Sequence, residues 1–439
     1  MKEIKLPEYK KIKLDNGLIV FLMKYTKLPL VNFRFLLRRG SVYDSPGKEG
    51  LARITASLLK KGTSHLNAVE IFNEIDLLGG EIECSADLDY SIAVGEFLSK
   101  NWDKGFDIFT DIILNPVFDD KEVERKKKKT LGEVIARKDN PGIVANLHFS
   151  KFLFKEHPYG KPISGTESSI NNITRNDIIN FYNKHYSPEN SILVIAGDFE
   201  EEKIMNKLYS TLSKWIANPD KDKPVVKSPS LEGINILIVD KPDLTQSQIR
   251  LGNVGINKNS DDYFAVRVMS NILGGGFNSR LNNEVRVKRG LTYGITSRFN
   301  TPLYPGEFVI STFTKNKTIL ETIEIILGEI KKIRTENVFD KELEGSQKYI
   351  TGLYPLSIET LELMSKQLTD IEFYGLDDKY VENYRKNTLY VGIDDVKYSA
   401  QKYLQTDNLV VVAVSNMKEI KKDLEKLGKV VCKSYKDEL

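Results

Sequence analysis

The chain has 439 residues, of which 41% are hydrophobic and 28% are charged, as in ordinary globular proteins. Its 64 lysine and arginine residues nearly balance its 61 aspartate and glutamate residues, and the net charge of +3 argues against a dedicated nucleic-acid-binding protein. This length exceeds that of one compact core and predicts about two to four structural units.

The cysteines and the apolar segments exclude further classes of protein. Cys84 and Cys432 lie far apart and form no CxxC motif, so neither a disulfide framework nor a cysteine metal site is indicated. The N-terminal segment lacks the apolar stretch of a signal peptide, and no apolar run approaches the ~18 residues that span a bilayer. We expect no membrane span and a cytoplasmic location, or a periplasmic one if a leader was removed.

The first half of the chain predicts strands, then helices, then one buried strand. Its first strands lie in 11–25, around an Asp-Asn-Gly turn, and in 29–41. The later elements are helices at about 48–61 and 67–78, a hairpin in 79–98, helices at about 100–114, 119–138, 142–155 and 174–184, the strand "NSILVIAGDF" and a helix through Trp215.

A second half repeats this order after the stretch "ANPDKDKPVVKSPSLEG", whose prolines and charges indicate a linker over 217–233. The repeated elements are a strand pair in 234–255, a helix at 260–273, a short helix in "NSRLNNEVRVKRGL", paired strands in "TYGITSRF" and "GEFVISTFT", helices from about 316 to 402, and the strand "NLVVVAVS". The pattern predicts an α+β fold of two duplicated lobes, 1–216 and 234–439, joined by an extended linker.

Seven segments in the right order resemble the pitrilysin/insulinase-type (M16) zinc peptidases, and the resemblance covers nearly the whole chain. They are "DNGLIVFL", "RRGSVYDSPGKEGLA", "KKGT", "LGGEI", "HPYGKPISGTESSINNITRNDIINFYNKHYSPENSILVIAGDF", "QSQIRLG" and "LGGGFNSRLNNEVRVKRGLTYG". The chain looks closest to the short bacterial members, which are similar to mitochondrial processing peptidase and the bc1 core proteins.

The resemblance implies a degenerate zinc motif. Active members carry H-x-x-E-H on the helix after the glycine loop, where two histidines bind zinc and the glutamate is the general base. The matching residues here begin at Arg53 and include Ala56 and Ser57, so both histidines and the glutamate are absent. Glu133 matches the third ligand. We therefore expect no metal in this chain, zinc in a partner subunit, and an Arg53–Glu133 ion pair in place of the metal.

The same resemblance assigns chemistry to the second half. Active members use an arginine to steer the substrate and a tyrosine, seven residues later, to hold the oxyanion, and Arg286 and Tyr293 match them. Without the resemblance, Arg286 would be a solvated helix residue and Tyr293 a half-buried residue of an alternating strand. In bacterial heterodimers of this family, one subunit carries the zinc helix and the other carries the Arg/Tyr pair.

Other polar features have ordinary structural explanations. None of the four histidines pairs with another at helical spacing, and we expect His157 and His185 to cap or bridge elements. The run "ERKKKKTLGE" predicts a solvated helix face, with an anionic partner surface as the alternative. The glycines at 274–276 indicate a helix end and turn. Glu83, Cys84 and Ser85 lie where active subunits pair with an extended substrate, but this text departs from the family's pattern.

Three functions compete. The leading hypothesis is a catalytically incomplete subunit that pairs with an H-x-x-E-H partner, forms a peptide-degrading or processing chamber and binds an extended peptide. The alternative is a purely structural subunit, like the bc1 core proteins, against which the retained Arg286 and Tyr293 argue. An autonomous peptidase with rearranged ligands has the least support, since no nearby set of ligand residues is present.

Overall fold

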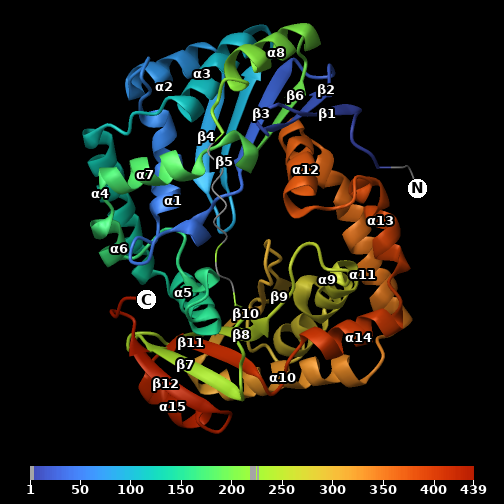
Figure 1. The fold of residues 1–439 in the computed structure, drawn as a ribbon. Helices are drawn as coiled ribbons and strands as arrows, with labels where there is room; N and C mark the ends of the chain where they lie inside the picture. The colour runs from blue at the N-terminus through green and yellow to red at the C-terminus, as the bar shows by residue number, and fades with distance from the viewer. Residues whose placement is uncertain (1–3, 218–223, 225–226) are drawn as a thin grey trace. The chain divides into compact units, whose positions relative to one another are not determined.

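The computed structural model describes residues 4–217, 224 and 227–439 and contains two compact units, each with a six-stranded sheet (Figure 1). One unit comprises Met1–Val134, Ile163–Pro224 and Pro355–Glu382, and the other comprises Ile135–Pro162, Val225–Tyr354 and Asn383–Leu439. The units are therefore not the contiguous halves 1–216 and 234–439. Positions 218–223 and 225–226 of the expected linker lie outside the described residues.

Two helices account for this difference between halves and units. Helix α5 (Pro141–Phe154) comes from the first half of the chain and packs on β8 and β11 of the second unit. Helix α12 (Leu361–Tyr374) comes from the second half and packs on β3 and β6 of the first unit. Each half of the chain thus supplies a helix that buries the other half's sheet.

The sheet of the first unit has the order β1-β2-β6-β3-β5-β4, in which only β2 and β6 run parallel. Its strands are β1 (Tyr9–Lys13), β2 (Ile19–Lys24), β3 (Leu30–Leu37), β4 (Glu81–Ala86), β5 (Ser91–Leu98) and β6 (Ser191–Gly197). The Phe33 ring on β3 packs against Phe97 on β5 and against Phe106 and Phe109 on helix α3 (Trp102–Leu114). This aromatic cluster forms the centre of the unit's core.

Other helices of the first unit contribute buried residues to the same core, and Figure 1 shows where they lie. They are α1 (Leu51–Leu58), α2 (Ala68–Leu77), α4 (Asp120–Ala136), α6 (Glu167–Asn172), α7 (Arg175–His185) and α8 (Glu201–Lys207). Helix α1 packs against β4, β5 and α7, which places the degenerate motif beside the edge strand β4.

The sheet of the second unit has the order β12-β7-β11-β8-β10-β9. Its strands are β7 (Ile234–Asp240), β8 (Gln246–Val254), β9 (Ile295–Phe299), β10 (Glu307–Lys315), β11 (Leu409–Ser415) and β12 (Lys429–Ser434). The predicted strands at 234–255 both form, but they are not paired with each other, because β11 lies between them, parallel to β7 and antiparallel to β8. The last five strands of this order, β7-β11-β8-β10-β9, correspond to β2-β6-β3-β5-β4 of the first sheet, which supports the predicted duplication.

The predicted helices of the second half also form. They are α9 (Tyr263–Ser270), α10 (Ile319–Thr335), α11 (Asp340–Leu353), α13 (Tyr380–Tyr390) and α14 (Ile393–Tyr403), and the structure adds α15 (Met417–Leu424). The sequence interpretation missed α6, α15 and β12. In the part of the chain that the structure describes, no helix is long and apolar enough to cross a membrane.

Candidate functional site

Helix α1 begins at a tightly held glycine loop. Gly50 precedes the helix with φ = 100°, in the left-handed region that favours glycine, and an added Cβ would lie 2.8 Å from Ile170 Cδ1. The buried Asp44 carboxylate accepts hydrogen bonds of 2.8 Å from the backbone amides of Gly50 and Ala52. An acidic side chain at this end also suits the helix dipole, so the loop fixes where α1 starts.

The motif positions on α1 do not fit a zinc ion. Arg53 is exposed and has a cationic side chain with no acceptor, and Ala56 is a fully buried methyl group. The Ser57 hydroxyl donates a 2.7 Å hydrogen bond to the carbonyl oxygen of Arg53 in its own helix. Among the described residues, no group of three or more His, Cys, Asp or Glu side chains is arranged to hold a metal. Glu133 remains a single carboxylate on α4.

The predicted ion pair between Arg53 and Glu133 is wrong. Within the described chain, no ion pair of 4.0 Å or less joins them, and Glu133 instead lies 3.9 Å from Lys129, one turn earlier on α4. Both Arg53 and Glu133 are exposed, so water solvates their charges and a pair between them would gain little.

Lys126 is the residue near this position that the sequence interpretation missed. Burial lowers the pKa of Lys126 most, Arg53 lowers it further, and Glu133 raises it. The side chain therefore lies in the electrostatic field of both motif positions. Four consecutive lysines give no sign that Lys126 and Lys127 are partly buried while the other two are exposed.

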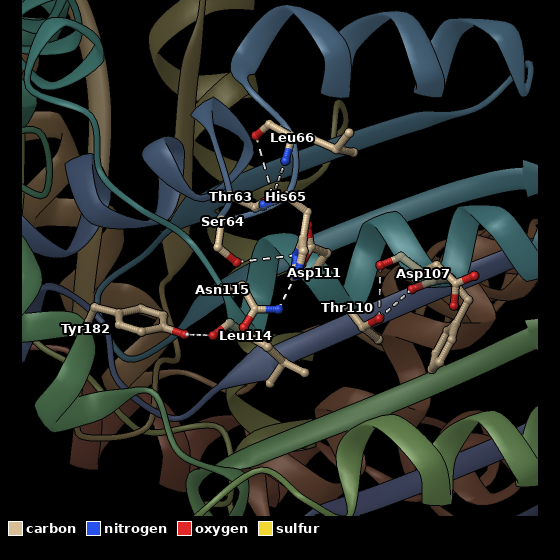
Figure 2. Close-up of polar contacts among 11 residues, drawn as sticks. Thr63, Ser64, His65, Leu66, Asp107, Thr110, Asp111, Leu114, Asn115 and Tyr182 are labelled. Atoms are coloured by element: carbon tan, nitrogen blue, oxygen red, sulfur yellow. Dashed lines mark hydrogen bonds and ion pairs between the residues drawn. The ribbon is translucent and has the colours of Figure 1, made fainter.

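The turn after α1 is anchored to helix α3 (Figure 2). His65 Nδ1 lies 2.7 Å from Asp111 Oδ1, and the amide of Asn115 donates to the same oxygen at 2.8 Å. The Thr63 hydroxyl accepts hydrogen bonds from the backbone amides of His65 and Leu66. His65 is thus a structural residue. The prediction for His157 is confirmed, since its Nδ1 accepts a 3.0 Å hydrogen bond from the Tyr159 amide.

Strand β4 lies at an edge of its sheet, as the interpretation of Glu83, Cys84 and Ser85 requires. Cys84 faces the core, and burial raises the pKa of its thiol to about 12, which makes it unreactive. Glu83 faces solvent and accepts a 2.8 Å hydrogen bond from Lys60, which also bonds the backbone of β4 at Ile82. The exposed side of this edge is therefore polar.

Arg286 and Tyr293 lie in the second unit on two neighbouring segments. Arg286 is in a short π-helical turn, Asn282–Val287, and its guanidinium lies 5.2 Å from the centre of the Phe277 ring. Tyr293 is in the turn before β9 rather than on the strand, and 84% of its surface is exposed. Thr312 on β10 holds this turn by donating a 3.0 Å hydrogen bond to the carbonyl oxygen of Gly294.

Phe277 is a second residue that sequence reasoning missed. Its ring is 73% exposed and lies against the Arg286 guanidinium, so it presents apolar surface beside that charge. Just before Phe277 the chain passes close to β9, since a Cβ on Gly274 would lie 2.8 Å from the backbone nitrogen of Ser297. The available signal was an aromatic residue inside an otherwise polar turn, "GGGFNSR".

Comparisons with known proteins agree on one family. The model described as "Insulinase (Peptidase family M16)" matches residues 21–167, and that described as "Peptidase M16 inactive domain" matches residues 172–350. An uncharacterized zinc protease of Rickettsia bellii is 29% identical over 84% of this chain and 88% of its own length. A protein of Helicobacter pylori named "Non-peptidase homolog YmxG" is 21% identical over 90% of this chain and 91% of its own length.

Solved structures show the same fold. The peptidase M16 inactive domain from Pseudomonas fluorescens has a TM-score of 0.86 and 26% identity, covering 93% of this chain and 98% of that one. The first half of the periplasmic protease PqqL from Escherichia coli has a TM-score of 0.78 at 15% identity, covering 96% of this chain and 95% of that one.

Proposed function

Because the chain belongs to the M16 peptidase family, we propose that it is a catalytically incomplete subunit that works with a homologous H-x-x-E-H partner on peptides. The incomplete character rests on this chain's own residues, since Arg53, Ala56 and Ser57 cannot replace the metal ligands and the general base. The Helicobacter pylori relative, named a non-peptidase homolog, agrees with that part of the proposal. In the proposed complex, the partner supplies the zinc.

The observation that carries the proposal is the exposure of Tyr293. A tyrosine with 84% of its surface in solvent adds little to the stability of its own unit, whereas its phenol can donate a hydrogen bond to an external group. A donor aimed at the oxyanion of a peptide under attack stabilises the transition state more than the substrate. Tyr293 would supply that hydrogen bond.

Arg286 would act earlier, by binding the peptide. Its guanidinium donates to carbonyl oxygens in a fixed planar geometry, and the contact with Phe277 restrains the side chain before substrate arrives. The exposed Phe277 ring adds an apolar surface beside this charge. Together these residues would orient a peptide without any metal ligand of their own.

Substitution in the reconstituted complex tests this proposal. Tyr293→Phe should lower kcat by about tenfold to a hundredfold, since only the phenol donor is lost. Arg286→Ala should raise KM as well, because steering precedes the transition state. Tyr390→Phe is the matched control, because Tyr390 is 75% exposed on α13. Normal assembly and wild-type cleavage by both variants would contradict the proposal and favour the purely structural subunit.

The proposed compartment is the cytoplasm. The likeness to a periplasmic protease of Escherichia coli makes the periplasm the alternative. Cell fractionation of the native host separates the two.

A further inference from the structure

Strand β4 has a free edge, and the register of its hairpin decides which backbone groups point there. At the closed end of the hairpin, the Asp87 amide donates a 2.8 Å hydrogen bond to the Tyr90 carbonyl oxygen. Hydrogen-bonded and non-hydrogen-bonded pairs alternate along an antiparallel ladder, and β4 pairs with β5 without a bulge. Three residues of β4 therefore direct their amides and carbonyls away from β5, namely Ile82, Cys84 and Ala86.

Lys60 occupies one of these outward-pointing groups. Its ammonium donates a 2.6 Å hydrogen bond to the Ile82 carbonyl oxygen and a 2.8 Å hydrogen bond to Glu83 Oε1. Lys60 lies in the short turn that follows α1, and only 22% of its side chain is exposed. Within the described chain, no hydrogen bond uses the outward-pointing backbone groups of Cys84 and Ala86. Lys60 therefore closes the edge at Ile82 alone.

An incoming strand cannot use the Ile82 carbonyl while Lys60 binds it. A peptide that extends a sheet forms main-chain hydrogen bonds with each outward-pointing group of the edge in turn. Hydrogen bonds from a charged donor are stronger than those between neutral groups, so a peptide amide does not compensate fully for the loss of the ammonium. The second bond, to Glu83, holds the ammonium in the same place. Displacing Lys60 therefore costs free energy that the peptide must supply.

We propose that Lys60 is an autoinhibitory residue: it closes the edge of β4 in the free subunit, and an extended peptide pairs with the whole of β4 only after Lys60 leaves Ile82. The inference deepens the proposed function, on which it rests, by naming a contact that regulates peptide binding. The occupant is an extended peptide, because the unpaired groups at this edge are backbone amides and carbonyls at the spacing of a strand.

Peptide binding to the full-length chain alone, without a partner, tests this inference. The probe is a short fluorescein-labelled peptide of alternating valine and threonine, and its binding is measured by fluorescence anisotropy. Lys60→Met keeps the apolar part of the side chain and removes the ammonium. This variant should bind the probe about tenfold more tightly than the wild type, because one backbone hydrogen bond becomes available without displacing a charged donor.

Two further variants separate blocking of the edge from a general effect of charge. Lys61→Met is the matched control, because Lys61 lies in the same turn and, among the described residues, makes no hydrogen bond to β4. It should change the affinity less than about twofold. Glu83→Gln weakens the contact that holds Lys60 and should raise the affinity about threefold. Lys60→Met and Glu83→Gln change the net charge in opposite directions, so a purely electrostatic effect would change the affinity in opposite directions.

Single N-methyl groups along the probe show whether it binds as an added strand. Only every second amide of such a strand donates a hydrogen bond to β4, because the amides between them point the other way. N-methylation should therefore weaken binding to Lys60→Met at alternate positions of the probe. Circular dichroism of each variant checks that the fold is retained.

Four results would overturn the inference. The first is equal affinity of the wild type and folded Lys60→Met for the probe, and the second is an equal gain in Lys61→Met. The third is weakening by N-methyl groups without alternation, which would assign the probe to another surface. The fourth is self-association of Lys60→Met on size exclusion without a gain in peptide binding, which would assign the edge to a second copy of this chain. Because no partner and no cleavage are involved, these outcomes are independent of the Tyr293→Phe test.

Discussion

Lys126 is a residue whose burial and charge environment could not be predicted from its residue type. It belongs to a run of four lysines for which the sequence predicts a solvated face, and for Lys128 that prediction holds. Lys126 instead is partly buried near the degenerate motif. Helical periodicity separates the two lysines by about 200° around α4, but only the packing of that helix decides which side is shielded.

The lowered pKa of Lys126 has a consequence for stability. A base whose pKa in the folded state lies below its unfolded value binds protons less readily when folded, so its charge destabilises the protein at neutral pH. Stability should rise as the pH approaches the usual lysine value of 10.5. Lys126→Met should therefore raise Tm at pH 7 by up to about 2 °C, and the gain should shrink above pH 10.

Thermal unfolding followed by circular dichroism at pH 7 and pH 10.5 measures this effect. Lys128→Met serves as the control and should leave Tm unchanged. A lower Tm for Lys126→Met at pH 7 would show that the charge of Lys126 is favourably placed in the free chain.

Arg286 and Tyr293 also show that sequence patterns identify residues at the candidate site without predicting their surroundings. Motif spacing identifies both residues, but alternation predicts Tyr293 on a strand, whereas it lies in the turn before β9. Phe277 lies in a segment that resembles the family but was given no role there, and it is recognised only from its exposure and its contact with Arg286.

At the scale of elements, local patterns predict most helices and strands but not how they pair. Periodicity and turn residues identify both strands in 234–255, since these signals are local. The insertion of β11 between them depends on contacts with a segment that begins at Leu409. The sequence also does not predict that α5 and α12 each pack on the sheet of the other half of the chain. An apolar helix face does not specify which sheet it covers.

Helix α5 carries a buried histidine that predicts acid sensitivity. His148 is 4% exposed, and its pKa is lowered to about 4, mainly by burial and then by Lys433, against the opposing effect of Asp437. A histidine with a depressed folded pKa contributes stability above its unfolded value of 6.5, and this is lost as the pH falls from 6.5 towards 4.

The His148→Gln variant should make the free energy of unfolding depend less on pH. Between pH 7 and pH 5 the wild type should lose on the order of 2 kcal/mol more of its free energy of unfolding than the variant. Urea unfolding at the two pH values measures it, and a constant packing loss cancels in the difference. His65→Gln is the control, since the His65 side chain is 66% exposed. Equal pH dependence in wild type and His148→Gln would contradict the assignment.

At the scale of the whole molecule, the helix exchange predicts that the halves fold together. A fragment of residues 1–216 lacks α12, which covers β3 and β6, and a fragment of residues 234–439 lacks α5, which covers β8 and β11. Each fragment would expose apolar sheet surface and aggregate. Coexpressed fragments should form a soluble complex, measured by size-exclusion chromatography. A soluble, cooperatively unfolding single fragment would contradict this prediction.

The duplication places the degenerate motif and the candidate residues Arg286 and Tyr293 on different copies of the same fold. The two sheets share five equivalent strand positions, yet the metal motif belongs to α1 in the first unit and Tyr293 to the turn before β9 in the second. Substitutions at Arg53, Ala56 and Ser57 therefore leave the second unit's candidate residues unchanged. This separation supports the proposal that the chain complements a partner that retains the zinc ligands.

We propose that this chain is inactive alone and completes a partner's peptidase. The direct measurement is the cleavage rate of a quenched fluorescent peptide by this chain, by an H-x-x-E-H homologue sought in the neighbouring reading frame, and by their equimolar mixture. We predict cleavage well above background only in the mixture, and its loss on adding a zinc chelator. Chelator-resistant cleavage by the repurified isolated chain, or equal rates for the partner alone and the mixture, would contradict the account.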